Sequence, residues 1–115
     1  MVKVIWTKRA FGQLGRAIKF IKEEQGSTYA EIVLNKILEK SRYLENFPQI
    51  GQVEPLLKHK KSEYRYIIVW SYKTIYRVDK EEVVISRVFH TSIIQKDYEE
   101  FKSGGQKYPT RAYEQ

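Results

Sequence analysis

The spacing of apolar residues changes once along the chain, near Gly51, and this change constrains the fold more than any other feature. Before Gly51, apolar side chains recur every three or four residues, which is the period of one face of a helix. After Gly51, tyrosine, isoleucine, valine and tryptophan form short runs between polar turns, which is typical of strands. Helical and strand signals are therefore segregated along the chain, and this predicts an α+β domain.

The first half predicts two helices. The first follows Thr7, a candidate N-cap, and places Phe11, Leu14, Ile18 and Ile21 on one face. Residues 25–27 break the pattern. Because the break is only three residues long, the next helix is expected to run back antiparallel to the first.

The second helix has a recognisable start and end. Thr28 and Glu31 have the spacing of a capping box, in which each side chain binds the backbone of the other residue. Phe47 precedes Pro48, and a residue before proline is disfavoured in a helix, so the helix ends near residue 46.

In the first helix Gly12 and Gly15 lower helix propensity, which predicts that another part of the protein packs closely against that surface of the helix.

The strand signals complete the predicted fold. One short strand covers residues 2–6, and three more, at residues 63–71, 73–78 and 83–90, form an antiparallel meander. The prediction is an N-terminal strand and a two-helix antiparallel hairpin packed on a small, about four-stranded antiparallel sheet. Residues 95–101 predict a short helix. Residues 1–101 are expected to form one domain, followed by a flexible tail at 102–115.

Composition excludes several classes of protein. The chain has no cysteine, which excludes a disulfide scaffold and a cysteine zinc site, and it has only two histidines. No apolar run approaches the roughly 18 residues of a membrane span, and no secretion signal is recognisable, so we expect a cytoplasmic protein. No nucleotide-binding loop or metalloprotease motif occurs, and neither a cofactor nor a metal is predicted.

The net charge of +7 is concentrated in two blocks. Residues 1–22 carry six basic side chains and no acidic one, and residues 58–77 carry six basic side chains against Glu63. Between them, residues 23–57 are net acidic. This distribution predicts a basic face that suits a polyanion or an acidic partner.

Alternation along the predicted strands separates the candidate site residues. Lys73 and Arg77 share one face of their strand, whereas the neighbouring Thr74 and Tyr76 point to the other. Arg65 lies in an apolar run, where an unpaired charge is costly. We therefore expect an internal ion pair that ties the sheet to a loop. The remaining candidates for binding RNA or another target are Lys58, Lys60, Lys61 and Arg87.

Three side chains could supply metal-free RNA cleavage, which requires a base, a cation at the phosphate and an acid. Glu54 is the candidate base, Lys73 the cation together with Arg65 or Arg77, and His90 the acid. Each has a simpler interpretation, namely a solvated loop carboxylate, a cation at a solvated sheet edge and a packed histidine.

The ordered series of motifs resembles the RelE/ParE superfamily of toxins from type II toxin–antitoxin systems. The resemblance runs in order through residues 4–7, 44–48, 51 and 54–56, then 64–69, 72–78 and 88–90. It implies a cognate antitoxin partner, expected to be acidic and partly disordered until it binds the basic face and the helical hairpin.

Members of this superfamily divide into two activities. RelE-like and YoeB-like toxins cut mRNA on the ribosome, and ParE-like toxins inhibit DNA gyrase without known catalysis. Glu54, Lys73 and His90 resemble the catalytic set of the nucleases, although Lys73 replaces their usual arginine and Thr91–Ser92–Ile93 their usual basic or aromatic residues. The first hypothesis is therefore a ribosome-dependent mRNA endonuclease; the alternatives are a gyrase inhibitor and a non-toxic relative.

Overall fold

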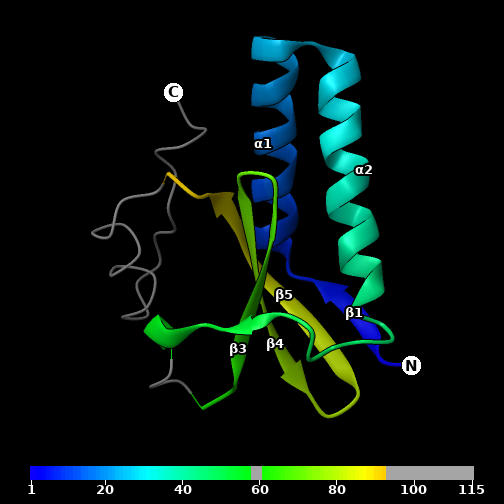
Figure 1. The fold of residues 1–115 in the computed structure, drawn as a ribbon, viewed down its shortest axis with the longest axis vertical. Coiled ribbons are helices and arrows are strands. Elements are labelled where there is room, and N and C mark those ends of the chain that lie inside the picture. The colour runs from blue at the N-terminus through cyan, green and yellow to red at the C-terminus, as the bar shows by residue number, and fades with distance from the viewer. Residues whose placement is uncertain (58–60, 93–115) are drawn as a thin grey trace.

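The computed structural model describes residues 1–57 and 61–92. In chain order the elements are β1 (Lys3–Trp6), α1 (Lys8–Gln25), α2 (Ser27–Tyr43), β2 (Gln52–Val53), a 3₁₀ turn η1 (Pro55–Leu57), β3 (Tyr64–Val69), β4 (Tyr72–Asp79) and β5 (Glu82–His90). The helices precede the main strands, as the apolar spacing predicts (Figure 1). None of the helices in this part of the chain combines the length and the apolar character that a membrane span needs.

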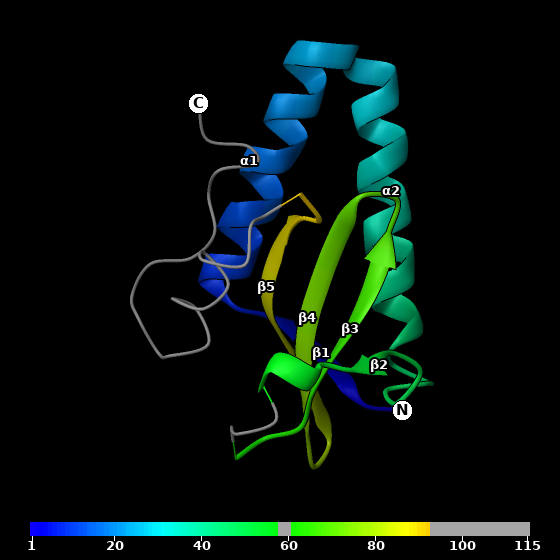
Figure 2. The same cartoon turned by 60° about the vertical axis from the view of Figure 1, so that its left-hand side comes forward.

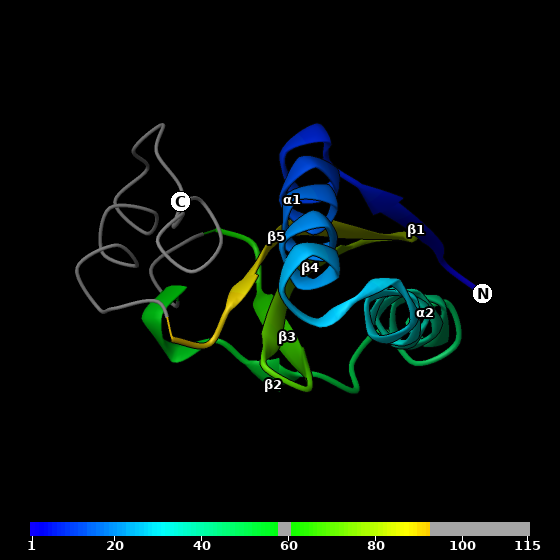
Figure 3. The same cartoon turned by 90° about the horizontal axis from the view of Figure 1, so that it is seen from above.

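The two helices form an antiparallel hairpin, and Figure 3, which looks along them, shows them side by side. Thr7 caps α1 as predicted, because its hydroxyl accepts a hydrogen bond from the Ala10 N–H at 3.0 Å. The predicted capping box is wrong. Gly26, with φ +96°, joins the helices directly, so α2 already begins at Ser27 and no side chain caps it.

The sheet has five strands in the order β1-β5-β4-β3-β2. The meander β3-β4-β5 is antiparallel as predicted, but β1 pairs with β5 in parallel, so the sheet is mixed. The prediction of about four antiparallel strands is therefore corrected in two respects. The direction of β1 relative to β5 leaves no signal in the local sequence, because the helical hairpin separates β1 from the other strands along the chain. The two residues of β2 are too few to show the alternation that marks a strand.

The core lies between the helical hairpin and one face of the sheet. Its fully buried members come from both helices and from the three long strands, and include Leu14, Ile21, Val33, Ile37, Ile75, Tyr76, Ile85 and Val88. A register shift at Ile75/Tyr76 inserts Ser86 into β5 as an extra residue. The buried Gln13 of α1 compensates for this irregularity, because its Oε1 accepts the Val88 N–H at 2.8 Å.

The close neighbour expected at the glycines of α1 and the helix and tail predicted at the C-terminus remain to be compared with the structure. No described atom lies within 4 Å of a side chain added at Gly15, so the close neighbour expected there is not found among the described residues. The short helix predicted at 95–101 and the flexible tail predicted at 102–115 lie outside the described residues.

Candidate functional site

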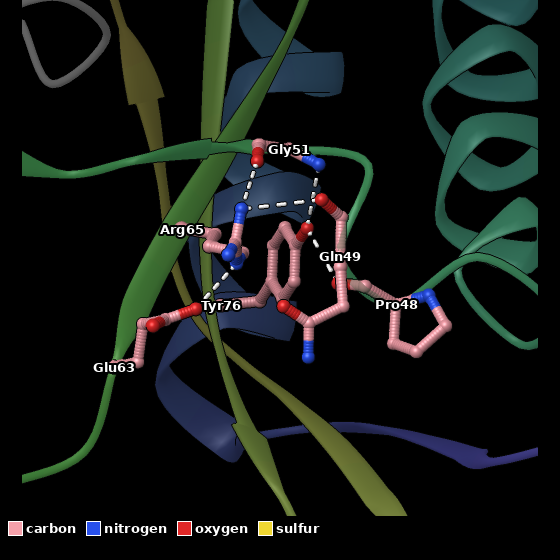
Figure 4. Close-up of polar contacts among 6 residues, drawn as sticks. All are labelled: Pro48, Gln49, Gly51, Glu63, Arg65 and Tyr76. Carbon is pink, nitrogen blue, oxygen red and sulfur yellow. Dashed lines mark hydrogen bonds and ion pairs between the residues drawn. The ribbon is translucent and has the colours of Figure 1, made fainter.

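A group of hydrogen bonds ties the loop after α2 to the sheet (Figure 4). The hydroxyl of the fully buried Tyr76 donates to the Pro48 carbonyl and accepts from the Gly51 N–H, both at 2.9 Å. Burial raises the pKa of Tyr76, against a smaller lowering by the Gly51 hydrogen bond, so the hydroxyl remains a donor at neutral pH. We call this group of contacts, with those of Arg65, the loop clasp.

Arg65 forms the other half of the loop clasp. Its Nη1 donates to the Gly51 carbonyl at 2.7 Å and to the Gln49 carbonyl at 3.1 Å, while its Nε pairs with Glu63 Oε2 at 2.6 Å. The expected ion pair is present, but its partner is the half-exposed Glu63 two residues earlier, and it is the two carbonyl hydrogen bonds that tie the sheet to the loop. The Arg65 guanidinium therefore makes its hydrogen bonds and its ion pair with other residues of the same chain.

Gly51 is needed at the centre of the loop clasp. A Cβ at this position would lie 2.5 Å from the Tyr76 hydroxyl and 2.6 Å from the Tyr66 carbonyl oxygen. Both distances are far below ordinary van der Waals contact, so only glycine allows the loop to approach the sheet this closely.

Glu54 and Lys73 meet on the sheet face away from the helices. Lys73 Nζ lies 2.6 Å from Glu54 Oε1, and the Glu54 side chain is only 1% exposed. The same ammonium lies 4.2 Å from the centroid of the Tyr66 ring, in a cation–π contact. The structure thus brings together two of the three candidate catalytic residues, as a buried ion pair.

His90 lies at the end of β5 and packs against Tyr72, with the ring centroids 5.2 Å apart in an edge-to-face arrangement. Its Nδ1 accepts the Ser92 N–H at 3.1 Å and lies 2.8 Å from the Ser92 hydroxyl. Burial lowers the pKa of His90, so the imidazole is neutral at pH 7.

Strand register places His90 away from the ion pair. On β4 and β5, Lys73 is opposite Phe89, and Tyr72 is opposite His90. Opposed residues of an antiparallel pair share a face, and adjacent residues of one strand point to opposite faces. His90 therefore lies on the helical face of the sheet, whereas Lys73 and Glu54 lie on the other.

The remaining basic candidates have varied surroundings. Arg77 Nε pairs with Asp79 Oδ2 at 3.0 Å. Burial alone would lower the pKa of Arg77, but interactions with Asp79 and Tyr64 together outweigh it, and the pKa is raised. Arg87 donates to the Ser86 carbonyl at 2.8 Å, and Lys61 lies exposed beside Glu54 and Leu57. Lys58 and Lys60 lie outside the described residues.

An exposed apolar rim, which the sequence did not predict, lies at the end of α2 and along the neighbouring strands. The rim comprises Tyr43, Phe47, Ile50, Val53 and Ile68, each between 41% and 55% exposed. Phe47, Ile50 and Val53 lie between the predicted helix and the predicted strands, where single apolar residues are common, so no pattern in the sequence marked them as a group. Within residues 1–57 and 61–92, no three His, Asp or Glu side chains are grouped as a metal site would require.

A helical hairpin on a five-stranded mixed sheet is the kind of α+β arrangement that the resemblance to the RelE/ParE superfamily implies. The family model described as "ParE toxin of type II toxin-antitoxin system, parDE" matches residues 4–94. The chain belongs to this family. The predicted superfamily and α+β fold are thus confirmed, and membership in a toxin–antitoxin system implies a cognate antitoxin.

A solved structure supports the fold. The chain is similar to one in the "Chromosomal ParDE TA system from P. aeruginosa", with a TM-score of 0.66 and 21% identity, over 78% of this chain and 96% of that chain. A search of curated protein sequences gave no match. At this identity the solved structure supports the fold and not a shared target.

Proposed function

We propose that the protein is a toxin that inhibits DNA gyrase by binding it, without cleaving a nucleic acid. This reverses the order of the two sequence hypotheses, in which the ribosome-dependent endonuclease came first. The family match favours this order, because the matching family is named for ParE.

The separation of His90 from the Glu54–Lys73 ion pair carries the proposal. A base and an acid acting on one phosphodiester must both reach the same few atoms, each within hydrogen-bond distance. Here the sheet itself lies between them. In addition, a carboxylate that is 1% exposed and paired at 2.6 Å is poorly placed to take a proton from a ribose hydroxyl.

The candidate phosphate-binding cations support the same conclusion. Arg65 is engaged by the loop clasp, Lys73 by Glu54 and Arg77 by Asp79. A cation that already binds a carboxylate stabilises a charged phosphorane less than an unpaired cation would, because the carboxylate neutralises its charge. These residues therefore suit a structural role better than a catalytic one.

The test is a paired assay with purified protein. We expect inhibition of gyrase supercoiling and accumulation of cleaved DNA–gyrase complexes, while mRNA in a reconstituted translation reaction retains its full length. Truncated mRNA together with unaffected gyrase would establish the endonuclease instead. If neither reaction changes and induced expression is harmless, the chain is a non-toxic relative.

A pair of variants sharpens this test. His90→Ala removes the candidate acid at a position far from the ion pair, and we expect gyrase inhibition to remain within about twofold of the parent. An endonuclease using His90 as general acid would lose about 100-fold or more of its cleavage rate. Lys80→Ala, at the exposed turn between β4 and β5, is the matched control for an unrelated surface change.

A further inference from the structure

A pocket walled by aromatic rings lies where the turn between β3 and β4 meets the two helices. Figure 2 shows this turn at the same end of the sheet as the C-terminal end of β5. The pocket has a volume of about 290 Å³. We call it the aromatic pocket, and the residues that line it include Phe20, Gln25, Tyr29, Trp70, Tyr72 and His90.

Trp70 has an unusual backbone conformation for so large a residue. Its φ is +56°, in the left-handed region that glycine adopts readily and bulky residues rarely adopt. Val69 pairs with Tyr72, so Trp70 is the first of only two residues in the turn, a place where glycine is common. The side chain is also 47% exposed. Because burial does not account for a tryptophan here, its strained backbone points to a function of the ring.

The rings form an outer wall and an inner wall. Trp70 packs on Tyr29 of α2, with the ring centroids 5.3 Å apart and the planes inclined by 36°. Tyr29 is 37% exposed, so this outer wall is accessible to solvent. The inner wall is the edge-to-face pair of the buried Tyr72 with His90. A flat ring that enters the aromatic pocket can therefore stack on the outer wall.

The polar groups around the aromatic pocket are neutral. Burial raises the pKa of Tyr72, and the neighbouring Tyr29 hydroxyl raises it further, so Tyr72 is protonated at pH 7. His90 is neutral, and its Nδ1 accepts the Ser92 N–H, so the ring proton is on Nε2. Gln25 adds an amide, which has donors and an acceptor. The lining thus combines hydrogen-bonding groups of both kinds with aromatic faces.

These properties select one class of ligand. No Asp, Glu, Lys or Arg is among the described residues that line the aromatic pocket, so an ion would lose hydration without gaining a partner of opposite charge. The net charge of +7 also opposes a cation. A hydrocarbon would leave the polar groups of the lining unpaired. A planar, uncharged heteroaromatic ring with donors and acceptors on its edge satisfies both the faces and the polar groups.

We propose that the aromatic pocket binds the nucleobase of a free nucleoside or nucleotide. The base stacks on Trp70 and Tyr29 and directs its polar edge to Gln25 and His90, while the sugar lies toward solvent. The volume is near the lower end of small-molecule sites, so it suits one ring system with a small substituent. The proposal does not depend on whether gyrase is the target.

The probe is adenosine, added to the full-length protein. Trp6 and Trp70 are the only tryptophans of the chain, so a Trp6→Phe protein reports on Trp70 alone. We expect adenosine to quench this fluorescence with a dissociation constant on the order of 0.1–1 mM.

Two other ligands define the class. Tetramethylammonium probes for a cation cage and should bind at least tenfold more weakly than adenosine. A short deoxyadenosine oligonucleotide presents the same base on a strand, and we expect its affinity per base to stay within about threefold of that of adenosine.

Variants of the outer wall are measured by titration calorimetry. Trp70→Gly removes the ring at a backbone conformation that glycine favours, so we expect a folded protein whose affinity for adenosine is at least tenfold lower. Trp70→Phe keeps a ring and should lose less than about fivefold. Tyr29→Leu removes the other ring and should also lose severalfold. The matched control is Phe11→Ala, which removes a 63% exposed ring more than two turns of α1 away from Phe20 and should change affinity less than twofold.

Several results would overturn the proposal. One is absence of adenosine binding at about 5 mM, and another is equal affinity for the Trp70→Gly and Trp70→Phe proteins. Tighter binding of tetramethylammonium would make the pocket a cation site, and at least tenfold tighter binding of the oligonucleotide would assign it to a nucleic-acid strand. If acrylamide does not quench Trp70 in the free protein, the chain fills its own pocket. A loss of gyrase inhibition would leave these measurements unaffected.

Discussion

Replacing Gly51 by alanine tests the loop clasp most directly. The added Cβ would lie 2.5 Å from the Tyr76 hydroxyl, 2.6 Å from the Tyr66 carbonyl oxygen and 2.9 Å from a Tyr76 ring carbon. Ordinary contact begins near 3.4 Å, so the first of these distances is too short by about 0.9 Å. Neither neighbour can yield easily, because Tyr76 is fully buried and the carbonyl belongs to a strand.

The expected change in the free energy of unfolding combines the cost of this close contact with the cost of a weakened hydrogen bond. Overpacking of a close-packed site costs about 1–3 kcal/mol. Moving the Tyr76 hydroxyl away also weakens its hydrogen bond to the Gly51 N–H, which adds about 1 kcal/mol. A gain of about 0.5 kcal/mol from a less flexible unfolded chain opposes these losses. We expect the free energy of unfolding to fall by about 2–3 kcal/mol and Tm by about 10 °C.

Gly15→Ala is the matched control. Gly15 lies in the middle of α1, and a side chain there would meet no described atom within 4 Å. The same substitution should therefore raise stability by up to about 1 kcal/mol, through helix propensity alone. Urea unfolding followed by tryptophan fluorescence measures both changes. If Gly51→Ala is as stable as the parent, the close approach of loop and sheet described here is wrong.

Three further variants probe the clasp, the ion pair and the histidine. Tyr76→Phe removes the hydroxyl bound to Pro48 and Gly51 and should cost about 1–3 kcal/mol in urea unfolding; a loss below about 0.5 kcal/mol would contradict the assigned bonds. Lys73→Met should cost about 3 kcal/mol because it leaves Glu54 buried without its cation, and adding Glu54→Leu should recover most of that loss. A double variant no more stable than the single one would argue against this pairing. His90 has a pKa below that of the unfolded chain, so the unfolded state binds more protons, and stability should decline as pH falls below about 6.5. The decline attributable to this residue should disappear in His90→Asn, as measured by thermal melts between pH 8 and pH 5; an identical pH profile in the variant would refute it.

Part of the candidate site could be predicted from strand periodicity and the cost of burying charge. The placement of Arg65 in an apolar run led to the expectation of an internal partner, and the structure supplies Glu63 and two loop carbonyls. Alternation alone also places Lys73 and Thr74 on opposite faces of β4. These inferences succeed because they depend on local geometry, which neighbouring residues determine.

The relation between His90 and Lys73 depended on information that is not local. It requires the register of β5 against β4, which the tight turn after Asp79 and the irregularity at Ser86 set together. One residue of difference in that register would move His90 to the face of Lys73. The sequence resemblance placed both residues in one catalytic set, because a linear motif carries no information about which face a side chain occupies.

By itself the sequence determined the helical hairpin, the strand meander and the superfamily, since each of these follows from periodic or ordered local patterns. The tertiary structure alone decided the parallel pairing of β1 and the burial of Glu54 against Lys73. These features join residues far apart in the chain, and their free energies depend on contacts that exist only after the helices and strands have packed. For this protein the class of toxin is thus encoded in local pattern, and the surfaces by which it would act are products of packing.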